Sequence, residues 1–201
     1  MAAAVRVVAI DPGIVNLAWV VATVSFNPVR MVVTAYGNED TTRECVVPGC
    51  GLKRSRELWD RLRHTDEHVI RPHAATADHV LVERQPPQGL GEVSSFFYSR
   101  YPQTELVHPR SVHKYFGIGG FDYAGRKVMS VKIAQNWIPD LSCGGRRTHD
   151  VADAVCIAWY WANAQAPPPA PAARPKCPAT QWMDVFKYDN DTPAPCQNIG
   201  T

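Results

Sequence analysis

The order of the apolar segments constrains the fold of this chain more than any other sequence feature. The run Val5–Ile10 is apolar and rich in β-branched residues, and it stops at the turn Asp11-Pro12-Gly13. This pattern predicts a buried strand. The segments Val15–Phe26 and Val29–Tyr36 are rich in Val, Thr and aromatic residues, and Asn27-Pro28 separates them. We therefore expect three antiparallel strands in succession.

The chain after these strands is expected to alternate between helices and strands. Residues 38–51 are polar and predict a loop. The predicted helices are Leu52–Ile70 closed by Pro72, Leu90–Tyr101, Ser111–Phe116, Tyr123–Trp137 and Thr148–Ala164 with Thr148 as its cap, and the predicted strands are His79–Glu83 and Glu105–His108. This order predicts an α/β fold of the RNase H-like arrangement, with a mixed five-stranded sheet flanked by helices.

The predicted domain covers residues 1–164, because the composition changes after them. Residues 165–178 contain six prolines, which favours an extended linker, and we expect 165–201 to be a flexible tail. No apolar run approaches the roughly 18 residues of a membrane helix, and the N-terminus lacks the pattern of a signal peptide. We therefore expect an intracellular protein without a membrane partner.

Four carboxylates stand at the ends of predicted elements. Asp11 follows the first strand and Glu83 ends the fourth. In this fold order the two strands lie side by side and run parallel, so their ends bring both acids together. Asp150 and Asp153 are three residues apart and share one face of the last helix near its positive N-terminal end.

Four converging carboxylates repel one another unless cations neutralise them, and Mg²⁺ prefers such oxygen ligands. We expect two Mg²⁺ ions, with Mn²⁺ as a substitute, and Asp11 between them as the bridging ligand. Two ions about 3.5–4 Å apart hydrolyse phosphodiesters, one activating water and the other stabilising the leaving oxygen. Each acid alone has a structural interpretation, such as a turn, an ion pair of Glu83 with Arg84, or a helix-end charge. The coincidence of all four favours a nuclease.

The residues around these acids resemble a known family. Residues 10–18 (IDPGIVNLA) resemble the opening Asp-x-Gly-x-x-Asn motif of RuvC-like Holliday-junction resolvases, in particular the poxvirus and fungal mitochondrial branch. Residues 82–85 (VERQ) are similar to that branch's Glu-Arg/Lys-Gln motif, and residues 149–154 (HDVADA) to its Asp-x-Ala-Asp-Ala/Ser helix. The likeness covers about residues 5–164. His149 departs from it, since an acid is common there, and its part as a metal ligand is left open.

The resemblance implies a homodimer that nicks two opposing strands of a four-way DNA junction symmetrically. In a large DNA virus such an enzyme would act where viral DNA replicates, in the host cytoplasm or nucleus. The stretch Thr104–Arg147 holds seven Lys or Arg against three Asp or Glu. The candidate phosphate contacts are Arg84, Arg110, Lys114, Arg126, Lys127 and Lys132, and the alternative for each is a solvated surface charge. Phe97, Tyr98 and Tyr101 could stack on bases, but packing of their helix on the sheet is the favoured interpretation.

Other functions compete with this one. A nuclease of the same fold acting on RNA–DNA hybrids or flaps stays open. A non-catalytic RNase H-like scaffold is disfavoured because it would be expected to have lost an acid. An actin-like ATPase also opens with Asp-x-Gly, but it needs a second Gly-rich loop and a larger two-lobed body. Cys45 and Cys50, five apart in a Gly/Pro-bearing turn, are a poor match to zinc spacings, so we expect no zinc, and Cys156 is predicted to be a core thiol.

Overall fold

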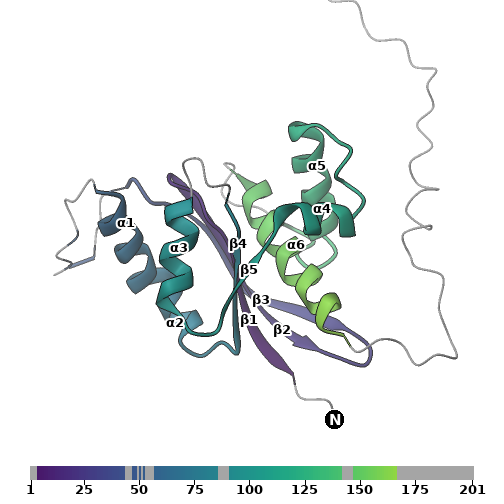
Figure 1. Ribbon diagram of the computed structural model, residues 1–201, viewed down its shortest axis with the longest axis horizontal. Coiled ribbons are helices and arrows are strands. Elements are labelled where there is room, and N and C mark those ends of the chain that lie inside the picture. The colour runs from purple at the N-terminus through teal and green to yellow at the C-terminus, as the bar shows by residue number, and fades with distance from the viewer. Residues whose placement is uncertain are drawn as a thin grey trace, which may run out of the picture. The chain divides into compact units, whose positions relative to one another are not determined.

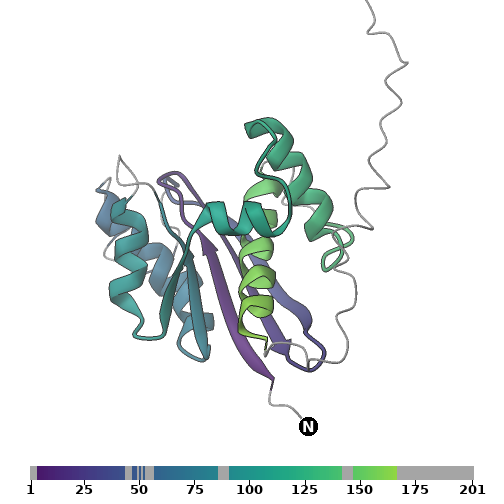
Figure 2. The same cartoon turned by 45° about the vertical axis from the view of Figure 1, so that its right-hand side comes forward.

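The protein is built on a mixed five-stranded sheet (Figures 1 and 2). A computed structural model describes residues 4–43, 47, 48, 50, 52, 57–85, 91–141 and 147–166, which fall in one compact unit, Met1–Pro167. The strands are β1 (Val5–Asp11), β2 (Asn16–Ser25), β3 (Arg30–Asp40), β4 (His79–Glu83) and β5 (Thr104–Val107), in the order β3-β2-β1-β4-β5. The first three pair antiparallel, whereas β1–β4 and β4–β5 pair parallel. The predicted fold class is confirmed.

The helices follow the predicted order. They are α1 (Leu58–Thr65), a π-helical turn η1 (Asp66–Ile70), α2 (Arg71–Ala74), α3 (Gly91–Arg100), α4 (Pro109–Tyr115), α5 (Tyr123–Ala134) and α6 (Thr148–Gln165). None of these described helices is long and apolar enough to cross a membrane. The predicted Pro-rich tail lies outside the described residues from position 167 onward.

Several predicted boundaries are wrong. The first predicted helix begins at Leu58 rather than Leu52, because the extended Glu57 is its N-cap, and the helix predicted to reach Trp137 ends at Ala134. Pro72 does not close the first helical region, because it lies in the first turn of α2, where a missing N–H is tolerated. Strand β3 does not end at Tyr36 but continues to Asp40, where it still pairs with Asn16 at the start of β2. Thr148 is the first helical residue rather than the cap, and Arg147 occupies the cap position of α6.

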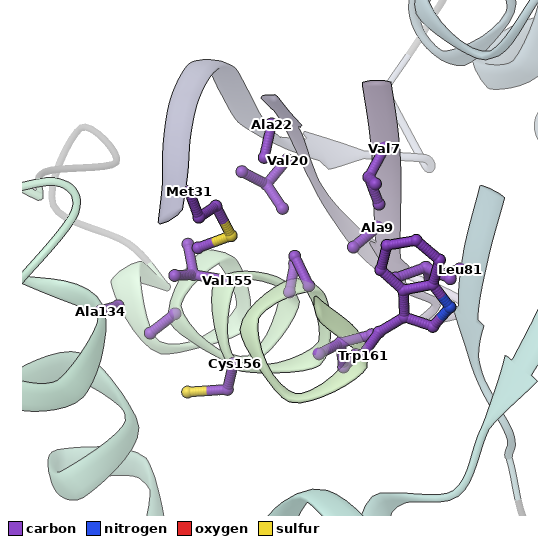
Figure 3. Packing of buried hydrophobic residues seen from close by; sticks show 14 of the residues in the cluster. Val7, Ala9, Val20, Ala22, Met31, Leu81, Ala134, Val155, Cys156 and Trp161 are labelled. Atoms are coloured by element: carbon purple, nitrogen blue, oxygen red, sulfur yellow. The ribbon is translucent and has the colours of Figure 1, made fainter. Parts of the chain in front are cut away.

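Alternation along the strands gives the sheet a core on each face. Val7 and Ala9 pack with α6, whereas Val8 and Ile10 pack with the helical layer of α1, η1, α2 and α3. Figure 3 shows Val155 and Trp161 of α6 beside these strands. Val151, Val155, Ala158 and Ala162 form an apolar stripe along α6, and all four are buried. This packing holds the N-terminal turn of α6 against the end of β1.

Candidate active site

Two carboxylates meet at the ends of neighbouring parallel strands. Asp11 is the last residue of β1 and Glu83 the last of β4. The register pairs Ile10 with Val82, so the next residue of each strand carries an acid at the same edge of the sheet. The proximity expected from the strand order is confirmed.

Helix α6 adds two more carboxylates. Asp150 and Asp153 lie in its first turns, and Asp150 is buried. One ligand oxygen from each of Asp11, Asp150 and Asp153 can be chosen so that all lie within 4.8 Å of one another. Glu83 borders this group, and its Oε1 accepts a hydrogen bond from Gln85 Nε2 at 3.1 Å. We call these four residues the acid cluster.

The environment of the acid cluster disfavours the ionised form of two of its carboxylates, Asp11 and Glu83. Burial, followed by the charges of Glu83 and Asp153, raises the pKa of Asp11 well above its usual range. Burial and the charge of Asp153 raise the pKa of Glu83 to about 7. At neutral pH these raised pKa values favour bound protons or cations at the cluster. Its donors are all carboxylate oxygens, a set that fits a hard divalent cation such as Mg²⁺ or Mn²⁺.

Lys127 supplies positive charge inside this cluster. Its Nζ lies 2.5 Å from Asp153 Oδ2 and 3.3 Å from Asp150 Oδ1, and its side chain is 21% exposed. Burial lowers the pKa of Lys127, but the charge and hydrogen bond of Asp153, together with Asp11 and Asp150, outweigh burial and raise it. Helix α5 packs beside α6. The sequence did not predict that Lys127 would point into the acids.

Arg147 was not predicted as part of the site. Its Nε donates to Asp150 Oδ2 at 2.5 Å. Its backbone has φ of 145°, a conformation that costs a non-glycine residue about 1–3 kcal/mol and is found mainly where neighbouring contacts impose it. The sequence did hold a signal for this contact, because Arg147 and Asp150 are three residues apart at the start of a helix, a spacing that allows an ion pair.

His149 contacts Asp150 but does not join the three carboxylates. Its Nε2 lies 3.2 Å from Asp150 Oδ1. Burial is the largest cause of a lowered pKa at His149, despite the nearby carboxylate. The structure therefore places the His149 ring beside Asp150, one of the predicted metal ligands.

The other predicted DNA contacts lie outside the acid cluster. The exposed ones are Arg84 after β4, Arg110 and Lys114 on α4, and Lys132 on α5. Arg126 is half-buried and donates from Nη1 to the Phe121 carbonyl at 2.7 Å. Among the aromatic candidates, Phe97 and Tyr101 are buried, which confirms packing on the sheet, whereas Tyr98 is 56% exposed.

Solved structures share this fold. No family model and no curated protein sequence matches the chain. The Thermus thermophilus RuvC structure is similar at 18% identity over 79% of this chain and 96% of that one, with a TM-score of 0.50. The fowlpox virus resolvase in complex with Holliday junction DNA is similar at 14% identity, covering 79% and 97%, with a TM-score of 0.56. The yeast mitochondrial resolvase Ydc2 is similar at 19% identity over 79% of each chain, again with a TM-score of 0.56.

These neighbours are all Holliday junction resolvases. At such identities the likeness shows the fold, so the chain has the RNase H-like fold of the RuvC-type resolvases. The resemblance that the sequence motifs indicated is thus matched by the three-dimensional structure.

Proposed function

We propose that this protein is a Mg²⁺-dependent endonuclease that resolves four-way DNA junctions by paired symmetric nicks. The observation that carries the proposal is the meeting of Asp11, Asp150 and Asp153 within 4.8 Å beside Glu83. These acids come from β1, β4 and α6, elements far apart in the sequence, and the same fold is found in the junction resolvases.

The catalytic residues in this proposal are Asp11, Glu83, Asp150 and Asp153, which would hold two divalent cations. The bound cations would polarise the phosphodiester and lower the pKa of a water. With a pKa of about 7, Glu83 is protonated in about half of the molecules near neutral pH in the metal-free site, and a bound cation would displace that proton. His149 orients Asp150 and is not itself a ligand.

Lys127 has a second role in this proposal. Its ammonium neutralises Asp150 and Asp153 before a cation binds. Its flexible four-carbon stem then lets the Nζ turn to a phosphate oxygen of the scissile strand. This motion reconciles the phosphate contact predicted from the sequence with the ion pairs in the structure.

We propose that the DNA backbone is contacted by four exposed cations, namely Arg84, Arg110, Lys114 and Lys132. Arg126, whose side chain bonds to the Phe121 carbonyl, lies at the edge of this group. Two copies related by a twofold axis would present two acid clusters to the two symmetric strands, so we propose a homodimer. We also propose an intracellular place of action, at sites of viral DNA replication if the source is a virus.

Cleavage of a panel of matched substrates tests this function. The full chain is incubated with Mg²⁺ and an immobile four-way junction, an RNA–DNA hybrid, a flap and a linear duplex of the same sequence. We expect paired nicks at symmetric positions in the junction only. We expect Asp150→Asn to abolish cleavage while junction binding in Ca²⁺ persists. Preferred cleavage of the hybrid or flap, or Mg²⁺-dependent nicking by Asp150→Asn, would overturn the assignment, and binding without cleavage by the wild type would indicate a scaffold.

A further inference from the structure

A second group of metal-ligating side chains lies away from the acid cluster. Cys50, His64 and His68 each offer one ligand atom, and these atoms lie within 4.8 Å of one another. Cys50 Sγ is 3.5 Å from His64 Nδ1, and the two imidazole rings are 4.7 Å apart. In the part of the chain that the structure describes, this is the one such group apart from the acids.

The backbone explains why these three residues meet. His64 lies in the last turn of α1 and His68 in the π-helical turn η1, so a spacing of four places both rings on one side of the helical segment. π-Helical turns are rare and occur frequently at functional sites. Cys50 ends a tight turn in which its N–H donates to the Val47 carbonyl at 3.3 Å.

This group is separate from the proposed nuclease site. Leu62 of α1 and Ile70 of η1 pack in the core on the face of the sheet opposite to α6. Figures 1 and 2 show α1 and α6 on the two sides of the sheet. Two members of the acid cluster, Asp150 and Asp153, belong to α6. The acid cluster therefore shares no residue with Cys50, His64 and His68, and the two groups lie on different sides of the sheet.

The donor atoms select a different class of ion. Thiolate and imidazole are ligands for Zn²⁺ and related transition metals, whereas Mg²⁺ takes oxygen. With Zn–S of about 2.3 Å and Zn–N of about 2.0–2.1 Å, tetrahedral geometry separates sulfur and nitrogen by about 3.6 Å. The observed separation of 3.5 Å between Cys50 Sγ and His64 Nδ1 matches this value.

We propose that Cys50, His64 and His68 hold a structural Zn²⁺ ion that ties Cys50 to the helical layer. The sequence spacing agrees with this site. Three residues separate His64 from His68, which is within the range of structural zinc sites. Cys45 lies outside the described residues. The cysteine spacing, taken without the two histidines, led to the expectation of no zinc.

Metal content and cobalt substitution test the proposal on the full-length protein. We expect the protein purified from zinc-supplemented medium to retain about one Zn²⁺ per chain after dialysis against EDTA-free buffer. We expect Co²⁺ to replace it and to give the visible ligand-field bands of a tetrahedral site with a thiolate-to-cobalt charge-transfer band. Cys50→Ser should lose the charge-transfer band, and His64→Asn or His68→Asn should lose tight Zn²⁺ binding.

Matched variants separate this site from the rest of the protein. Cys156→Ala removes another thiol, His73→Gln removes another histidine of the helical layer, and both should keep the metal. Asp150→Asn should also keep Zn²⁺, so failure of the nuclease assignment and failure of the zinc site give different results. Wild-type protein that retains no Zn²⁺ and shows no thiolate-to-cobalt band would overturn the proposal even if the Cys50 variant did not fold. Equal metal retention by wild type and a folded Cys50→Ser variant would overturn it as well.

Discussion

Replacing Glu83 by Gln should stabilise the metal-free protein at alkaline pH. Glu83 ends β4 beside Asp11, where burial and the charge of Asp153 raise its pKa from 4.5 to about 7. Gln has the same shape, carries no charge, and keeps an oxygen that can accept the hydrogen bond from Gln85 Nε2. The substitution therefore removes the cost of an ionised carboxylate without opening a cavity.

The pKa difference sets the size and the pH window of the effect. Below about pH 4.5, Glu83 is protonated in both the folded and the unfolded protein, so the raised pKa has no effect on stability. Between about pH 4.5 and 7 the unfolded chain loses this proton first, so wild-type stability falls as the pH rises, and it levels off above pH 7. At 1.36 kcal/mol per pKa unit, the loss amounts to about 3 kcal/mol. The amide introduced by Glu83→Gln does not titrate, so this loss is absent from the variant.

Urea unfolding in EDTA from pH 4 to pH 8 measures this effect. We expect Glu83→Gln to exceed wild type by about 3 kcal/mol at pH 8, which is roughly 6–12 °C in Tm for a domain of this size, and to match it near pH 4. Glu92→Gln, which removes an exposed acid of α3, should leave the whole curve unchanged. A Glu83→Gln advantage that is the same at pH 4 and pH 8, or absent at both, would refute the reasoning.

Three further predictions concern Lys127, Lys132 and Asp66. Lys127→Met should lower Mg²⁺-dependent junction cleavage at least about 100-fold, because it removes the ammonium that is proposed to turn from Asp150 and Asp153 to the scissile phosphate. Single-turnover kinetics would show this loss, and an effect below threefold would contradict the role. Lys132 lies on the exposed side of the same helix. Lys132→Met should leave the cleavage rate at saturating protein unchanged and should reduce the slope of log binding constant against log salt concentration by about one. An unchanged slope would show that Lys132 does not contact the DNA backbone. Asp66→Ala should destabilise the fold by about 2–3 kcal/mol in urea unfolding, because it leaves the buried Tyr101 hydroxyl without its acceptor and removes the hydrogen bond from Arg100 Nε at 2.8 Å. Glu67→Ala, which breaks an exposed pair with Arg71, should cost under about 1 kcal/mol, and equal losses for the two variants would disprove this distinction.

Most of the fold could be predicted because its elements carry local patterns. The continuous apolar run Val5–Ile10 and the Asp-Pro-Gly stop defined β1, and the apolar stripe of α6 defined its buried face. The errors occurred at boundaries, where a tertiary contact outweighs the local pattern. Arg147, for example, takes the α6 cap position in place of Thr148 while its side chain pairs with Asp150.

The sequence by itself determined that Asp11 and Glu83 would meet, because both end strands that the element order makes parallel neighbours. Asp150 and Asp153 could be assigned to one helix face from their spacing alone. Only the tertiary structure decided that Lys127 enters the acid cluster and that Cys50 reaches His64 and His68. The direction of a side chain on a helix depends on the rotation of that helix about its axis. Packing against distant segments, such as α6 for α5 and the sheet for α1, sets this rotation, and residue spacing does not encode it.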